Sequence, residues 1–185
     1  MKELSLNILD IAKNSVKAGA DNIEIIIEET DSEFVLSIND DGSGMKQSFL
    51  ESVIDPFCTT RTTRKVGMGI PLLKMEAELT GGGFDIESKH FEEYPDCHGT
   101  KITAKFYKNH IDFTPLGDIV ASIITLIQGS PNIDWYFKHN TNGKVVELNT
   151  KELREILGED VSLGEYEVIK WVTEYLNEQY SSDTQ

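Results

Sequence analysis

A strand that runs directly into an acidic, glycine-rich loop constrains this chain more than any other feature. In the predicted strand over residues 34–39, Phe34, Leu36 and Ile38 share one face because side chains alternate along a strand. Asp40 has the same parity and would place a carboxylate on that apolar face. An unpaired buried charge is costly. Either the chain turns before Asp40, or the Asp40 carboxylate has a partner group in the folded protein. Gly42 and Gly44 would let a backbone or a flat ligand approach, although Asp-Gly and Ser-Gly pairs are also typical of a plain turn.

The composition is that of a soluble globular protein, with 185 residues, 39% hydrophobic and 26% charged. The net charge is −15, which argues against a surface that binds duplex nucleic acid. No segment reaches the roughly 18 consecutive apolar residues of a membrane span. Two distant cysteines, Cys58 and Cys97, favour a reducing cytoplasm. Oxidation sensing by Cys58 and metal binding by Cys97 with His98 are alternatives to unreactive thiols.

Helical spacing predicts a helix over residues 4–17, with a polar stripe formed by Asn7, Asp10, Asn14 and Lys17. The plain interpretation of that stripe is a solvated face. A strand over residues 99–107 places the hydroxyl of Thr100 on its apolar face, where it could bond the Asp40 carboxylate. The remaining predicted elements of this half are strands over 22–28, 33–39 and 84–89, a helix over 48–53, and a helix that includes Pro71 in its first turn.

Residues 59–70 are the one locally basic stretch, rich in threonine and arginine, and they lead into the helix at Pro71. A helix N-terminus presents free N–H groups and a partial positive charge, which suit phosphate. An ordinary loop is the alternative, because a lone Gly-x-Gly is weak evidence for a ligand site.

The character of the chain changes after Tyr107. We expect a strongly apolar helix opened by Thr114 and Pro115, a hairpin turning at Asn142 and Gly143, a short helix, and a last helix opened by a Ser162–Glu165 capping box. No chemistry can be assigned to this helix-hairpin-helix-helix unit. We expect its apolar helix to pack on the first domain or on a partner.

Five motifs in order resemble those of the GHKL superfamily, the gyrase, heat-shock chaperone, histidine kinase and mismatch-repair ATPases. The resemblance covers residues 1 to about 107 and not the tail. The motifs are an N box over 10–20, a first glycine box Asp40-x-Gly42-x-Gly44, an F box and lid over 55–61, a second glycine box Gly67-x-Gly69, and a final Gly99-Thr100.

The resemblance implies an α+β fold, a two-layer α/β sandwich of the histidine kinase-like ATPase type. Its mostly antiparallel sheet would be covered on one face by helices. We predict this ATP-binding domain over residues 1–107 and a small α+β appendage over residues 108–185, which would bind a protein partner or form a homodimer.

The resemblance also assigns roles within an ATP site. Asn14 would bind Mg²⁺ through its amide oxygen. Asp40 would accept a hydrogen bond from the adenine amino group, with Thr100 beside it. The other implied nucleotide-binding residues are Gly42, Gly44 and Met45 at the base, Gly67, Met68 and Gly69 at the phosphates, and Thr59, Thr60 and Arg61 in the lid.

Asp10 precedes Asn14 by one helical turn, the spacing at which ATP-hydrolysing relatives carry a carboxylate that orients water. Glutamate is usual there, and aspartate is one methylene shorter. We therefore expect Mg²⁺-dependent ATP binding with slow hydrolysis and Asp10 as the catalytic residue. The alternatives are a stand-alone serine/threonine kinase resembling anti-sigma factor kinases and a non-catalytic ATP sensor. The four histidines are not expected on a phosphoacceptor helix, which argues against a complete sensor kinase.

Overall fold

One sheet organises the residues that the computed structural model describes, which are 3–54, 68–158 and 160–181. Within these ranges the sheet has six strands in the order β3-β4-β2-β1-β5-β6. The elements along the chain are α1 Leu4–Lys17, β1 Asn22–Glu29, β2 Glu33–Asp40, α2 Gln47–Ile54, α3 Gly69–Leu79, β3 Gly83–Lys89, β4 Gly99–Tyr107, α4 Ile119–Gly129, β5 Asp134–Thr141, β6 Lys144–Asn149, α5 Thr150–Leu157 and α6 Tyr166–Ser181.

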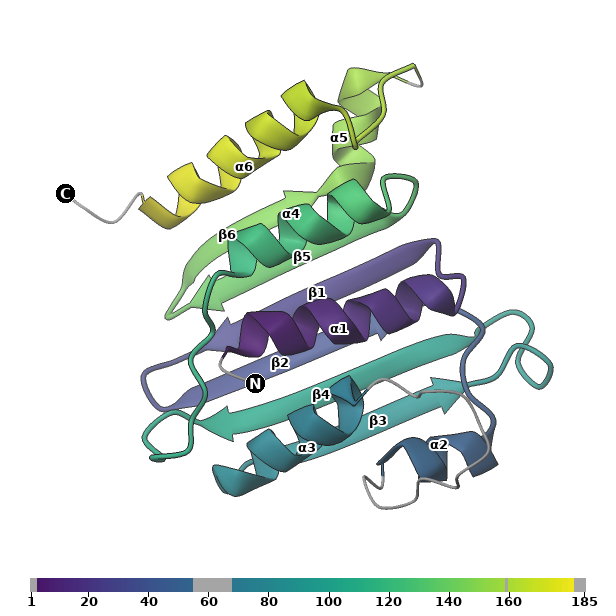
Figure 1. Ribbon diagram of the computed structural model, residues 1–185, viewed down its shortest axis with the longest axis vertical. Helices are drawn as coiled ribbons and strands as arrows, with labels where there is room; N and C mark the ends of the chain where they lie inside the picture. Colours follow the sequence, from purple (N-terminus) through teal and green to yellow (C-terminus); the bar gives the residue numbers. More distant parts are fainter. Residues whose placement is uncertain (1–2, 55–67, 159, 182–185) are drawn as a thin grey trace.

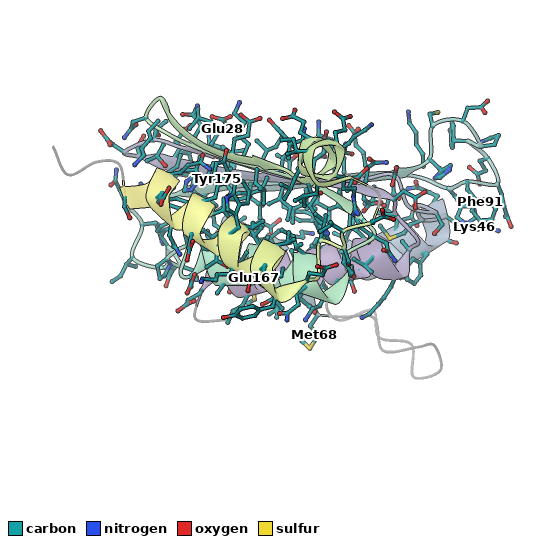
Figure 2. All side chains as sticks on the ribbon, turned by 90° about the horizontal axis from the view of Figure 1, so that it is seen from above. Glu28, Lys46, Met68, Phe91, Glu167 and Tyr175 are labelled. Atoms are coloured by element: carbon teal, nitrogen blue, oxygen red, sulfur yellow. The ribbon has the colours of Figure 1, made fainter. Side chains whose placement is uncertain are left out.

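The molecule has two layers, and the fully buried residues of each central strand lie on the one face that the helices cover. In β1, Ile23, Ile25 and Ile27 are buried beneath the helices, whereas Glu24 and Glu28 are exposed. Figure 1 shows α3, α1, α4 and α6 side by side on one face of the sheet. In Figure 2 the sheet is seen along its edge, with Glu28 on the face opposite the helices.

The strand pairing confirms the expected mixed, mostly antiparallel sheet. Strand β2 pairs antiparallel with β1 and β4, and β3 pairs antiparallel with β4. The one parallel pair in the described sheet joins β1 to β5, with Asn22 opposite Asp134. The observed fold is therefore the predicted two-layer α+β sandwich.

The C-terminal elements continue the same sheet. The hairpin of β5 and β6 turns at Asn142 and Gly143, as predicted, and α4 packs against both α1 and α6. The sheet thus runs across the boundary at residue 107, and the division of the chain into two domains stays a prediction.

The apolar helix α4 begins at Ile119 and not at Thr114, as the sequence pattern suggested. Two contacts explain the later start. The carbonyl groups of Pro115 and Leu116 accept hydrogen bonds from the first N–H groups of α1, so this segment runs along the start of another helix. Asp118 then caps α4 by accepting a hydrogen bond from the N–H of Ala121 at 2.9 Å.

Candidate functional site

Strand β2 holds through Asp40, so its carboxylate projects from the strand's apolar face and is half-buried. Two protein donors meet it. The hydroxyl of Ser15 on α1 donates to Oδ2 at 2.6 Å, and the backbone N–H of Gly42 donates to Oδ1 at 3.0 Å. Each carboxylate oxygen can accept more than one hydrogen bond, so both keep capacity for a ligand. Asp40 is therefore an oriented acceptor.

Thr100 lies directly opposite Asp40 in the ladder between β2 and β4, as its parity predicted. Its hydroxyl, however, lies 2.8 Å from that of Ser88 on β3. The prediction that this hydroxyl is the partner of Asp40 was wrong, because Ser15 reaches the carboxylate from the helix layer. The alternation along a strand does not identify which side chains of the covering helix will contact that strand.

The glycine loop after Asp40 is held closely against the end of β3. Gly44 has φ of +65°, and a Cβ there would lie 1.9 Å from the carbonyl oxygen of Lys89. The adjoining backbone N–H of Met45 donates to Ser88 Oγ at 2.8 Å. Gly44 is therefore required for loop packing, whether or not a ligand is bound.

The connection between β3 and β4 holds this loop from a second side. The N–H of Phe91 donates to the carbonyl oxygen of Ser43 at 3.0 Å. His98 Nδ1 lies 2.6 Å from the carbonyl oxygen of Gly42. Since a carbonyl oxygen only accepts, the Nδ1 of His98 must be the donor.

Asp41, next to Asp40, has a structural role: it joins the loop after β2 to the start of β1. Its carboxylate accepts hydrogen bonds from the backbone N–H groups of Asp21 and Asn22 and from the side-chain amide of Asn22. Partial burial opposes ionisation, but these hydrogen bonds outweigh it and hold the pKa of Asp41 below its usual value. The two adjacent aspartates thus have different roles.

Asp10 on α1 lies against the first turn of α3. A Cβ on Gly69 would be 2.6 Å from Asp10 Oδ2, so no side chain larger than glycine fits there without moving the carboxylate. Met68, the N-cap residue of α3, makes no capping hydrogen bond with its side chain and is exposed (Figure 2). Asp10 therefore faces the positive end of a helix dipole, close to backbone N–H groups of the kind that bind phosphate.

Most of the polar stripe of α1 is not a solvated face. Asn7 is fully buried, and its side-chain N–H donates to Glu76 on α3. Its Oδ1 has no hydrogen-bond partner among the described residues. Asp10 and Asn14, further along the stripe, are half-buried. The plain interpretation of a solvated face is therefore wrong for the part of the stripe that α3 covers, whereas Lys17 at its end is exposed.

The predicted site residues fall into two neighbouring groups. Asn14 and Ser15 are adjacent on α1, and the bond from Ser15 to Asp40 joins the groups. The sequence pattern did not identify Ser15 as a site residue, although a serine on the apolar face of a helix could have indicated it. Nor did it identify Ser88 and His98 as site residues, because their roles follow only from their contacts. The first group, at α1 and α3, contains Asp10, Asn14, Met68 and Gly69. The second group, at the strand ends, contains Asp40, Gly42, Gly44, Met45 and Thr100. Outside the described residues lie Cys58, Thr59, Thr60, Arg61 and Gly67.

Within the described ranges, no group of three or more His, Cys, Asp or Glu side chains could hold a metal ion. Cys97 is exposed and is not in a disulfide. None of the four histidines lies in a helix, as expected: His139 is in β5, and the other three are in connections between elements. In the part of the chain that the structure describes, no helix combines the length and apolar character needed to cross a membrane.

Comparison of the sequence with known families gives one match over more than half of the chain. Residues 2–110 match the family described as histidine kinase-, DNA gyrase B- and HSP90-like ATPase. The sensor protein SrrB of Staphylococcus aureus is 34% identical over 94 residues, which are 48% of this chain and 16% of that protein. The chain therefore spans only a small part of this relative.

Solved structures share the fold at low sequence identity. The Aquifex aeolicus MutL ATPase domain complexed with ADP has a TM-score of 0.56 at 13% identity, covering 85% of this chain and 69% of that one. The N-terminal domain of a DNA repair protein has a TM-score of 0.54 at 15% identity, covering 86% of this chain and 58% of the other. Residues 1–107 cannot supply this coverage alone, so the likeness in fold continues into the C-terminal part.

Proposed function

Because the chain belongs to the family of histidine kinase-, DNA gyrase B- and HSP90-like ATPases, whose domains bind ATP, we propose that it binds ATP with Mg²⁺ and hydrolyses it slowly. The scarcity of cysteine favours the reducing cytoplasm as its compartment.

The oriented carboxylate of Asp40 is the observation that carries this proposal. Ser15 and Gly42 each donate to one of its oxygens, so its remaining acceptor positions have a fixed direction. The 6-amino group of adenine has two hydrogens to donate to such an acceptor. Guanine presents a carbonyl oxygen at that position and would be repelled, which gives the site a preference for adenine.

The phosphate groups would lie between α1 and α3. The first turn of α3 presents backbone N–H groups at a helix N-terminus, and the Asp10 carboxylate lies beside Gly69 there. Asn14, on the same side of α1 as Asp10, offers a neutral amide oxygen, a ligand type that fits Mg²⁺. Asn14 would hold the ion, which when bound would neutralise charge on the phosphates.

Asp10 is the proposed catalytic base. Its carboxylate would accept a proton from the water whose oxygen attacks the γ-phosphorus, while the bond to the bridging oxygen of ADP breaks. The carboxylate lies beside Gly69 at the start of α3. This placement supports a role for Asp10 despite its short side chain.

The substitution Asp10→Asn tests the hydrolase proposal. We expect phosphate release to fall by about 100-fold or more, because a general base contributes about 10²–10⁴ in rate, while ATP affinity measured by calorimetry stays within about threefold. Asp112→Asn, in an exposed loop, is the matched control and should change neither quantity. Unchanged phosphate release by the Asp10 variant would exclude this carboxylate as the base.

One surface favours a second candidate, in which the protein acts on or through a protein partner. Trp171 and Tyr175 are stacked on the outside of α6 with ring centroids 5.0 Å apart, and both are substantially exposed. Figure 2 shows Tyr175 on α6, and Glu167 precedes Trp171 by one turn. Exposed aromatic pairs of this kind are enriched at protein interfaces.

Two forms of this second candidate make different predictions. A stand-alone kinase would transfer phosphate to a serine or threonine of its partner, and Asp10→Asn would abolish the transfer. A sensor would keep ATP-dependent partner binding in the same variant. Sedimentation of the wild type and Trp171→Ala with and without ATP tests the homodimer: a dimer lost in the variant supports it, and monomers throughout exclude it.

A further inference from the structure

His98 occupies a position from which it can control the base-binding end of the site. It is the last residue before β4, followed directly by Gly99 and Thr100. Its ring is half-buried, and Nδ1 donates to the carbonyl oxygen of Gly42 at 2.6 Å. This contact joins residues 56 positions apart in the chain. It is shorter than most hydrogen bonds from nitrogen, as expected for a closely held pair.

Gly42 connects His98 to Asp40, because it is hydrogen-bonded to both side chains. Its own N–H donates to Asp40 Oδ1 at 3.0 Å, so His98 and Asp40 hold the two polar groups of one residue. Gly42 is also buried against Ala18 at the end of α1, and the next N–H, that of Ser43, donates to the carbonyl oxygen of Ala18 at 2.9 Å. Gly42 is thus held from the helix layer on one side and by His98 on another.

We infer that His98 is a specificity-determining residue that positions the Asp40 carboxylate for the adenine amino group by holding the Gly42 carbonyl. His98 acts through Gly42, so it is a positioning residue. The inference rests on the proposed function, since it concerns the base of the nucleotide proposed for this site.

Loss of the His98 imidazole should therefore weaken the contact between the adenine amino group and Asp40 more than the other contacts of the nucleotide. Without His98 the Gly42 carbonyl loses its donor, the turn from residue 40 to residue 44 can relax, and Oδ1 of Asp40 loses its fixed direction. The phosphate end, at Asp10 and Gly69, is built from other elements. The expected defect is in discrimination of the base.

The test measures discrimination directly, by calorimetry with Mg²⁺ and two probes, ATP and purine riboside triphosphate, which lacks the 6-amino group. We expect the wild type to prefer ATP by about 10- to 150-fold, the range for one hydrogen bond to a charged acceptor. In His98→Leu the preference should fall to within about threefold. His98→Asn carries an amide N–H near the position of Nδ1 and should restore most of it.

The matched control is His110→Leu. His110 is exposed, and its Nδ1 accepts a local hydrogen bond from Asp112 N–H at 3.2 Å, outside the site. This variant should keep the wild-type preference. Thermal unfolding of each variant shows that the protein measured is folded.

Three results would overturn the inference. The preference for ATP could survive in His98→Leu, or both nucleotides could weaken equally in a folded variant, which would mean a general loosening of the loop. As the third result, the preference for ATP over purine riboside triphosphate could stay lost in His98→Asn. Absence of ATP binding by the wild type would instead refute the proposed function, and the inference with it.

Discussion

Replacing Asp40 by asparagine removes a charge from the site while leaving the local fold satisfied. In the structure Gly42 N–H donates to one carboxylate oxygen and Ser15 Oγ to the other. An asparagine can keep its oxygen towards Gly42 and turn its NH₂ group towards Ser15, whose hydroxyl also accepts. The site then loses its negative charge, and amide hydrogens take the place of one of its two acceptor oxygens.

The expected loss is that of one hydrogen bond to a charged group. Such bonds contribute about 1.5–3 kcal/mol, which corresponds to a weakening of about 10- to 150-fold in the Kd for ATP. Calorimetric titration with ATP and Mg²⁺ measures this change. Thermal unfolding of the same samples should show a shift of no more than a few degrees, since the local hydrogen bonds can be rebuilt.

Asp41→Asn is the matched control, because it makes the same substitution at the next residue. Asp41 accepts three hydrogen bonds from Asp21 and Asn22 at the start of β1, so this variant should lose about 1 kcal/mol of stability and keep its ATP affinity. An Asp40→Asn protein that binds ATP as tightly as the wild type would refute the assignment of Asp40 to the base.

Three further outcomes follow from the contacts of single residues. Gly44→Ala should lose more than about 2 kcal/mol in urea unfolding because its Cβ would meet the Lys89 carbonyl oxygen at 1.9 Å, whereas Gly83→Ala, with nothing within 4 Å, should lose far less. Burial lowers the pKa of His139 despite its hydrogen bond to Glu29, so the wild type should lose stability as the pH falls below about 6.5, and His139→Gln should reduce that loss between pH 7.5 and 5.5. The lowered pKa of Asp41 predicts a separate loss below about pH 4, which Asp41→Asn should remove.

Local patterns were sufficient to predict most of the fold. The alternation in residues 22–28 and 33–39 gave the central hairpin because one face of each strand is buried. The helix at 4–17 followed from its apolar spacing, and the Asn142-Gly143 turn from its residue types. Each of these signals lies within a few residues of the element it predicts.

What the sequence did not reveal depends on contacts between distant segments. No local pattern says that β5 pairs with β1, because Trp135 and Phe137 would be buried beside any strand of the sheet. The burial of Asn7 depends on α3, and the bond from His98 to Gly42 depends on the path of a connection. Periodicity records which face of an element is apolar, and it does not identify the neighbour that covers that face.

Helix α1 is one element through which the C-terminal part of the described structure meets the candidate site. Helix α1, which carries Asp10 and Asn14, lies between α3 and α4, and its first N–H groups are bonded to the carbonyls of Pro115 and Leu116 (Figure 1). Helix α6 packs on the far side of α4. A protein bound at Trp171 and Tyr175 would therefore influence the nucleotide by shifting α4 against α1, since packed helices transmit small displacements to their neighbours.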